Sequence, residues 1–285
     1  MPFNCFFASD LHGRTHRYKE LFKKILSERP NLVFLGGDLL PPFGHFANHS
    51  YEAFFNEFLL SEFQQLKQQL GQDYPRILYI FGNDDPGSQM EAALHLEKQG
   101  FWTHIHNRWI EIEGQWICGY AYVPPTPFRL KDWERYDVSR FVDPGCVAPA
   151  EGIRTVEISP RVLNYATIQQ DLETLTQGKE VANAIFLFHS PPYKTNLDRA
   201  GLDGKQVDHV PLDLHVGSIA VRRFIEARQP MLTLHGHIHE SARIMGSWRD
   251  RIGQTHLFSA AYDGSELALV RFNTANLDKA TRSIL

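Results

Sequence analysis

Five short apolar segments, spread over most of the chain, each end directly in a cluster of polar side chains. These segments cover residues 4–9, 32–35, 77–81, 184–188 and 231–234. Short, continuously apolar runs are typical of β-strands that are buried on both faces, as in a parallel sheet covered by helices. In open α/β sheets, ligands bind outside the carboxyl ends of the strands, which is where the five polar clusters follow. We therefore expect the clusters to converge on one site.

Segments with helical periodicity lie between the apolar runs, so the predicted class is α/β. Apolar residues recur at helical spacing in residues 18–26, 55–70, 90–99 and 218–228. We expect a second sheet from the strand-like segments at residues 109–113, 116–120, 256–260 and 266–272. The length of 285 residues is compatible with a single α/β domain that spans residues 1–285.

Residues 121–159 interrupt this alternation of strands and helices. The segment contains five prolines and several aromatic residues, so it is too aromatic for a disordered linker and too interrupted for a core element. We predict that it is an ordered insertion. Two roles are open: a surface loop that packs on itself, or a lid that shapes the substrate pocket.

The composition excludes several classes of protein. A formal net charge of −4 offers no basic surface for broad nucleic-acid binding. No apolar run approaches the roughly 20 residues of a membrane span, and residues 1–10 lack the features of a signal peptide, so we expect a cytoplasmic protein. The odd number and unrelated spacing of the cysteines argue against a disulfide framework and against a thiolate zinc site. The cysteines are Cys5, Cys118 and Cys146.

The polar clusters combine carboxylates, imidazoles and one amide. The candidate ligands are Asp10, His12, Asp38, Asn83, His189, His237 and His239. An isolated Asp-x-His or His-x-His pair is more often hydrogen bonded than metal bound, but clusters at equivalent places on five strands are difficult to attribute to chance. Oxygen and imidazole donors without a thiolate suit a divalent ion such as manganese, iron, cobalt or zinc.

The number of candidate ligands favours two ions over one. Seven side chains are too many for a single tetrahedral site, whereas one bridging carboxylate would let them supply four protein ligands to each of two ions. Two divalent ions carry four positive charges, of which Asp10 and Asp38 would offset two. A positive site of this kind would allow an acidic protein to bind phosphate.

The order of these motifs resembles the calcineurin-like metallophosphoesterase superfamily. It is carried by Asp10-x-His12, Gly37-Asp38, Gly82-Asn83, His189 and Gly236-His237-x-His239. Three longer motifs are similar to those of the Icc-related branch of predicted phosphoesterases. These motifs are His189-Ser-Pro-Pro-Tyr193, His215-Val-Gly-Ser218 and Gly236-His-Ile-His-Glu240.

This resemblance implies a four-layer sandwich of two mixed β-sheets flanked by helices. It also implies two divalent metal ions, with Mn²⁺ preferred and Fe, Zn, Co or Ni as alternatives. One ion would be bound by Asp10, His12, Asp38 and His239. The other would be bound by Asp38, Asn83, His189 and His237. Asp38 would therefore bridge the two ions.

The sequence departs from the family pattern directly after Asn83. Many members have a histidine there that contacts the phosphate and protonates the leaving group, whereas this chain has Asp84. A carboxylate beside two cations should be ionised at pH 7, which makes it a poor proton donor. We expect Asp85 to orient His12 or a metal-bound water. The candidates for a substitute donor or phosphate contact are His235, His215, Lys194 and Arg14.

Several of these candidates have an equally simple structural interpretation. His235 ends a buried strand and is either a substrate contact or a hydrogen-bonded core imidazole. Arg14 either reaches a phosphate oxygen or is solvated at a helix start. Gly217-Ser218 either caps the following helix or contributes to an anion site.

The predicted activity is hydrolysis of a small phosphodiester by direct attack of a metal-bound hydroxide. A phosphomonoesterase or nucleotide phosphatase is the alternative enzyme. A non-catalytic metal-binding scaffold of the same fold is the alternative from another class. The expected partner is a small phosphate ester, without a role for broad nucleic-acid binding or for a membrane.

Overall fold

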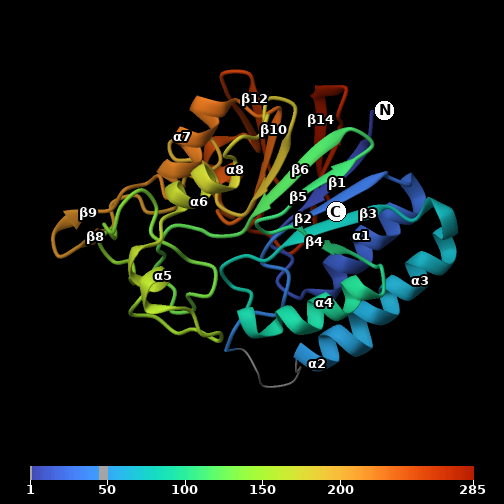
Figure 1. Cartoon of the computed structure of the whole chain (residues 1–285), viewed down its shortest axis with the longest axis horizontal. Coiled ribbons are helices and arrows are strands. Elements are labelled where there is room, and N and C mark those ends of the chain that lie inside the picture. The colour runs from blue at the N-terminus through green and yellow to red at the C-terminus, as the bar shows by residue number, and fades with distance from the viewer. Residues whose placement is uncertain (1, 45–50) are drawn as a thin grey trace.

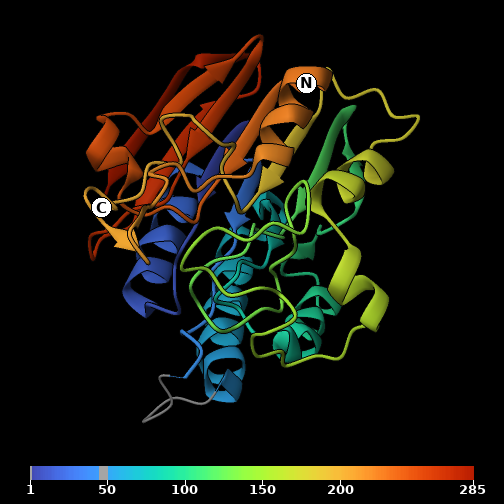
Figure 2. The same cartoon turned by 90° about the vertical axis from the view of Figure 1, so that its left-hand side faces the viewer.

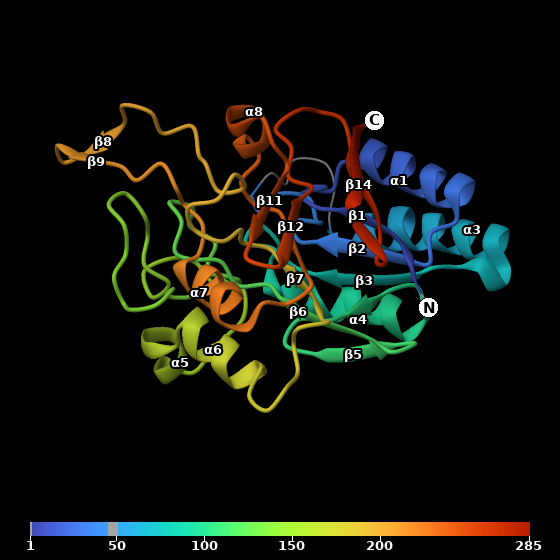
Figure 3. The same cartoon turned by 90° about the horizontal axis from the view of Figure 1, so that it is seen from above.

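The computed structural model describes residues 2–44 and 51–285. Two six-stranded sheets pack face to face, with helices on their outer faces (Figure 1). The first sheet has the order β14 (Asn276–Ile284), β13 (Ala268–Asn273), β1 (Asn4–Ala8), β2 (Leu32–Gly36), β3 (Arg76–Ile80) and β4 (Thr103–His104). The second has the order β11 (Arg249–Ile252), β12 (Thr255–Ser259), β10 (Leu232–His235), β7 (Ile185–Phe188), β6 (Gln115–Tyr120) and β5 (Trp109–Ile112). A small hairpin of β8 (Gln206–Val207) and β9 (Val210–Pro211) stands apart from both (Figure 3).

Helices cover the two sheets on opposite sides of the molecule (Figures 1 and 2). The first sheet is covered by α1 (Thr15–Glu28), α3 (Leu60–Leu70) and α4 (Met90–Lys98). The second is covered by α6 (Ile168–Leu175) and α7 (Ile219–Arg228). The remaining helical segments are α2 (Tyr51–Ala53), the π-helical η1 (Phe54–Leu59), the 3₁₀ turns η2 (Gly71–Asp73) and η3 (Gly87–Gln89), α5 (Pro160–Tyr165) and α8 (Ser241–Met245). The predicted four-layer sandwich is confirmed.

Each sheet has one face against helices and one against the other sheet. Phe258 of β12 contacts Phe272 of β13 across the interface, with ring centroids 5.9 Å apart. Because the central strands are buried on both faces, β2 of the first sheet and β7 and β10 of the second carry the same continuous apolar pattern, which does not reveal sheet membership. The segment 266–272, predicted for the second sheet, instead lies in the first as β13, antiparallel to β1. The prediction was wrong on this point, whereas β5, β6 and β12 do lie in the second sheet.

The insertion at 121–159 docks on both halves of the molecule. Asp132 Oδ2 accepts a hydrogen bond from Gly87 N (2.8 Å), and Trp133 contacts Phe81 at the end of β3. On the other side, Asp137 Oδ2 accepts a hydrogen bond from the amide of Ile219 (2.7 Å) at the start of α7. The insertion therefore does not pack only on itself.

None of the helices in the described part of the chain combines the length and the apolar character that a bilayer crossing requires.

His104 makes the stability of the first sheet sensitive to acid. Its ring lies 5.1 Å from that of Tyr79, and burial lowers the pKa of His104 from 6.5 to about 4. Between these values the unfolded chain binds a proton that the folded chain does not. The free energy of unfolding should therefore fall as pH decreases from 6.5 to 4, by up to about 1.4 kcal/mol per pH unit from this residue.

Urea unfolding of wild type and His104→Gln from pH 7.5 to pH 4 tests this expectation. The difference in unfolding free energy between the two proteins should change with pH only below about 6.5. Equal pH dependence in the two proteins would show that His104 does not couple to folding.

Candidate metal centre

All seven predicted ligands come together at the carboxyl ends of the strands. Two groups of side chains place their donor atoms within 4.8 Å of one another. One group is Asp10, His12, Asp38 and His239, and the other is Asp38, His189 and His237. The seventh residue, Asn83, joins the second group because its Oδ1 lies 3.1 Å from Nε2 of His189. Asp38 is common to both groups, which is the place predicted for a bridging carboxylate.

The contacts join the two sheets. From the first sheet, Asp10 Oδ1 lies 3.2 Å from Nε2 of His239 and accepts a hydrogen bond from the amide of His237 (3.0 Å). Nε2 of His12 also lies 3.2 Å from Nε2 of His239. From the second sheet, Nε2 of His189 lies 3.3 Å from Oδ2 of Asp38. The centre thus takes donors from β1, β2 and β3 on one side and from β7 and β10 on the other.

Four members of the centre have a left-handed backbone. The φ angles are 57° for Asp10, 49° for His12, 50° for Asp38 and 74° for His237. This conformation costs about 1–3 kcal/mol for a residue other than glycine, although Asp, Asn and His adopt it more readily than most. Hydrogen bonds from Asp10 N to Gly37 O (2.9 Å) and from His12 N to Asp38 O (2.8 Å) hold it in place. Such concentrated backbone strain is characteristic of functional sites.

Two glycines allow this close approach of loops. A Cβ at Gly82 would lie 2.3 Å from Oδ1 of Asp38 and 2.6 Å from Nε2 of His189. A Cβ at Gly236 would lie 2.1 Å from Oγ of Ser9 and 2.7 Å from Oδ2 of Asp10. These distances are too short for any side chain, so both motif positions require glycine.

The hydrogen bonds of His189 prepare it to bind a metal ion. Its Nδ1 lies 2.7 Å from the carbonyl oxygen of Gly36, which can only accept, so Nδ1 carries a proton and Nε2 points into the centre. Burial alone would lower the pKa of His189, but the carboxylate of Asp38 outweighs it and raises that pKa to about 9. Burial would likewise raise the pKa of Asp38, but His189 outweighs it and lowers the value to about 2. A divalent ion fits a site whose anions otherwise hold protons on neighbouring imidazoles.

Asp84 and Asp85 lie in different surroundings. Asp85 is fully buried, and its oxygens accept hydrogen bonds from the amides of Leu39 (3.1 Å), Leu40 (2.7 Å) and Gly82 (2.8 Å). It joins the loops after β2 and β3, and its hydrogen bonds go to these backbone amides and not to His12, which corrects the predicted contact between Asp85 and His12. Asp84 lies beside His12 instead, with Oδ2 3.3 Å from Nδ1 of that ring.

His235 is a core residue and not a proton donor to substrate. It is fully buried, its Nδ1 donates to Ser190 O (2.9 Å), and its Nε2 accepts from the hydroxyl of Thr233 (2.7 Å). The ring lies parallel to Phe188, with centroids 5.7 Å apart. Burial lowers the pKa of His235 to about 3. Both ring nitrogens are engaged, which removes His235 from the catalytic candidates.

The three candidates for substrate contact lie outside the cluster. Among the described residues, none of them forms a hydrogen bond or ion pair with the seven proposed ligands. Nδ1 of His215 lies 2.8 Å from the buried Asp198, whose other oxygen accepts from the amide of Lys194 (2.8 Å). Nη1 of Arg14 donates to Gly264 O at 3.3 Å. Arg14 and Lys194 are exposed and His215 is partly exposed, so all three stay candidates for contacts with a larger substrate.

Two side chains that the sequence did not reveal organise the surroundings. Asp137 of the insertion accepts from Ser218 Oγ (2.5 Å), while Ser218 caps α7 by accepting from Val221 N (3.0 Å). The capping role predicted for Ser218 is confirmed, and the carboxylate of Asp137 occupies the anion position at this helix start. Arg17 is the second such side chain: it binds the backbone carbonyl of Asp10.

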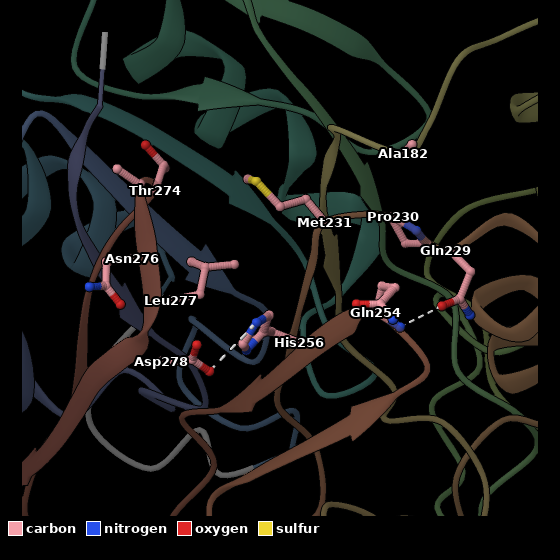
Figure 4. A pocket seen from close by; sticks show the side chains of 11 residues that line it. Ala182, Gln229, Pro230, Met231, Gln254, His256, Thr274, Asn276, Leu277 and Asp278 are labelled. Atoms are coloured by element: carbon pink, nitrogen blue, oxygen red, sulfur yellow. Dashed lines mark hydrogen bonds and ion pairs between the residues drawn. The ribbon is translucent and has the colours of Figure 1, made fainter.

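A hollow of about 380 Å³ lies away from this centre. It is bordered by Met231 and His256, at the amino ends of β10 and β12, and by Asp278 of β14 (Figure 4). The proposed ligands follow the opposite, carboxyl end of β10. The hollow is therefore separate from the candidate metal centre.

Comparison with known proteins identifies relatives of this fold. A family model described as calcineurin-like phosphoesterase matches residues 4–241. One crystal structure aligns with 100% of this chain and 99% of its own, at a TM-score of 0.60 and 14% identity. The protein TT1561 of Thermus thermophilus aligns with 100% of this chain and 99% of its own, at a TM-score of 0.56 and 15% identity. No curated protein sequence matches the chain.

Proposed function

Because the chain belongs to the calcineurin-like phosphoesterase family and is a hydrolase of phosphate esters, we propose that it is a two-metal phosphodiesterase for small substrates. The observation that carries this proposal is the pair of donor groups that share Asp38. A single-ion enzyme would need only one of the two groups. The geometry thus supports two ions with a common carboxylate.

Each ion would be held by side chains from both sheets. We assign Asp10, His12, Asp38 and His239 to one ion. Asp38, Asn83, His189 and His237 are assigned to the other. Bound divalent ions neutralise charge on phosphate oxygens and lower the pKa of a coordinated water to about 7. The protein's own part is to hold these donors rigidly, through the strained backbone at the ends of β1 and β2, before substrate arrives.

Asp84 favours a diester over a monoester. Its side chain is 32% exposed at the edge of the centre, so it presents a negative charge to an approaching phosphate. A phosphodiester carries one negative charge, whereas a monoester approaches two at pH 7 because its second pKa is about 6. Charge repulsion therefore penalises the monoester more. The position also supplies no imidazole to protonate a poor leaving group, so esters with an acidic leaving group should react faster than esters of ordinary alcohols.

Hydrolysis of bis-p-nitrophenyl phosphate and p-nitrophenyl phosphate with Mn²⁺ tests this proposal. We expect higher kcat/KM for the diester, complete loss of both activities with a chelator, and recovery when Mn²⁺ is added back. In Asp84→Asn, kcat/KM for the monoester should rise about tenfold relative to the diester, because one repulsive charge is removed.

Other results would select an alternative function. A clear preference of the wild type for the monoester would identify a phosphomonoesterase or nucleotide phosphatase. If neither ester, nor a broader panel, is hydrolysed with Mn²⁺, Fe²⁺, Zn²⁺, Co²⁺ or Ni²⁺, the protein is better described as a metal-binding scaffold of the same fold.

A further inference from the structure

Arg17 is a buried cation in the first turn of α1, and its hydrogen bonds go to backbone carbonyls. Only 4% of the residue is exposed. Nη1 donates to Asp10 O, Nη2 to Gly264 O (2.5 Å) and Nε to Ser265 O (3.1 Å). One guanidinium therefore joins the loop after β1, which carries a proposed metal ligand, to the loop between β12 and β13.

The position is costly for a cation. A helix start carries partial positive charge, and α1 has no acidic residue in its first turn that would offset it. Burial lowers the pKa of Arg17, and Arg14 adds a like charge nearby. A buried charge is retained only where its hydrogen bonds compensate for the lost hydration. The three carbonyl contacts and the attraction of the nearby Asp10 and Glu266 carboxylates provide that compensation, and the carbonyl contacts tie the two loops to the guanidinium.

We propose that Arg17 is a positioning residue for the metal centre. It holds the carbonyl of Asp10 and thereby fixes the left-handed conformation at this residue, with φ 57°. That conformation directs the Asp10 carboxylate towards the amide of His237 (3.0 Å) and Nε2 of His239 (3.2 Å). Without the guanidinium, Asp10 N still donates to Gly37 O (2.9 Å), but the Asp10 carbonyl loses its contact with Arg17, so the left-handed conformation and the direction of the carboxylate are held less tightly.

Through Arg17, the proposed metal centre is connected to a part of the chain that lies outside the match to the family model. That match ends at residue 241, whereas Gly264 and Ser265 lie in the later loop. The loop is tied to the chain end, since Leu267 and Leu285 exchange backbone hydrogen bonds of 2.9 Å. The end of β14 accordingly lies beside the start of α1 (Figure 3). The C-terminal segment thus supports the centre through Arg17.

His16 offers a matched control. It is exposed, and its Nε2 lies 2.6 Å from the same carbonyl of Ser265 that Arg17 contacts. In the described structure, His16 has no hydrogen bond to Asp10. His16→Gln therefore weakens the contact between α1 and the later loop without removing the support of Asp10.

The test is a titration of the purified full chain with Mn²⁺, in which electron paramagnetic resonance measures the free ion. The inference rests on the proposed function, so the wild type should bind two ions. In Arg17→Met, one of the two binding steps should weaken about 10- to 100-fold, as when a residue that orients a metal ligand is lost. The Mn²⁺ affinity of Arg17→Lys should lie between those of the wild type and Arg17→Met, because lysine keeps the positive charge but not the planar set of guanidinium donors. His16→Gln should stay within about twofold of wild type, since it leaves Asp10 supported.

The outcomes separate the two claims. The unfolding temperature of each metal-free variant shows whether it is folded, and Arg17→Lys is the deciding protein if Arg17→Met does not fold. The role of Arg17 is overturned if Arg17→Lys and Arg17→Met bind Mn²⁺ with wild-type affinity at both steps. It is also overturned if both binding steps weaken equally. In either case the proposed function still stands. A wild type that binds neither Mn²⁺ nor, in equilibrium dialysis, Fe²⁺, Zn²⁺, Co²⁺ or Ni²⁺ refutes the proposed function, and this inference with it.

Discussion

Asp38→Asn is expected to reduce metal-dependent hydrolysis by more than about 100-fold while the protein stays folded, because residues that only orient metal ligands already contribute about 10- to 100-fold. Asp38 belongs to both donor groups, so its charge would be lost from both proposed ions at once. Asparagine suits the local structure, since it tolerates the left-handed backbone of this residue, φ 50°. Its oxygen can still accept the hydrogen bond that Asp38 Oδ1 receives from Asp84 N (2.8 Å).

The measurement is kcat/KM for bis-p-nitrophenyl phosphate, together with the unfolding temperature in the absence of metal. Asp73→Asn is the matched control, because Asp73 pairs with Arg29 on the surface and is 57% exposed. This control should retain wild-type activity. If Asp38→Asn keeps more than about a tenth of the wild-type rate, Asp38 is not a shared ligand.

Lys131→Met is expected to cost about 3–5 kcal/mol of folding free energy, the usual effect of removing one partner from a buried ion pair. Nζ of Lys131 lies 2.5 Å from Oε2 of Glu134, and both side chains are fully buried in the insertion. Burial raises the pKa of Glu134 to about 7 even with the lysine present. Without the lysine, Glu134 of the folded protein keeps its proton at pH values where Glu134 of the unfolded chain, with a pKa near 4.5, has lost it.

The sign of the pH effect follows from this difference. A group whose folded pKa is raised stabilises the protonated folded state, so the stability of Lys131→Met should fall as pH rises from about 4.5 through 7 and beyond. Urea unfolding at pH 5.5 and pH 8 should therefore give the larger loss at pH 8. The double variant Lys131→Met/Glu134→Leu should recover most of it, because no buried charge is left unpaired. A loss below about 1 kcal/mol at both pH values would show that the pair is not essential to the insertion.

The sequence predicted the strands and the grouping of the candidate ligands well because both depend on local patterns. A continuous apolar run followed by Asp, Asn or His marks the end of a buried strand, and glycines such as Gly82 mark the tight approach of loops. Sheet membership was not predictable, since the central strands of both sheets are equally buried. Asp137 and Arg17 were also missed, because their partners lie far along the chain and no spacing rule connects them. His235 directly precedes the Gly236-His237-x-His239 motif, which suggested a role at the site. Its ring instead points into the core, and the sequence pattern does not determine that direction.

The origin of the donors has a thermodynamic consequence. One layer supplies Asp10, His12, Asp38 and Asn83, and the other supplies His189, His237 and His239. Any free energy gained by coordinating ions is therefore also free energy of cohesion between the layers. With the two proposed ions bound, neither sheet could separate from the other without releasing them, so metal supply and the mechanical integrity of this sandwich would be linked quantities.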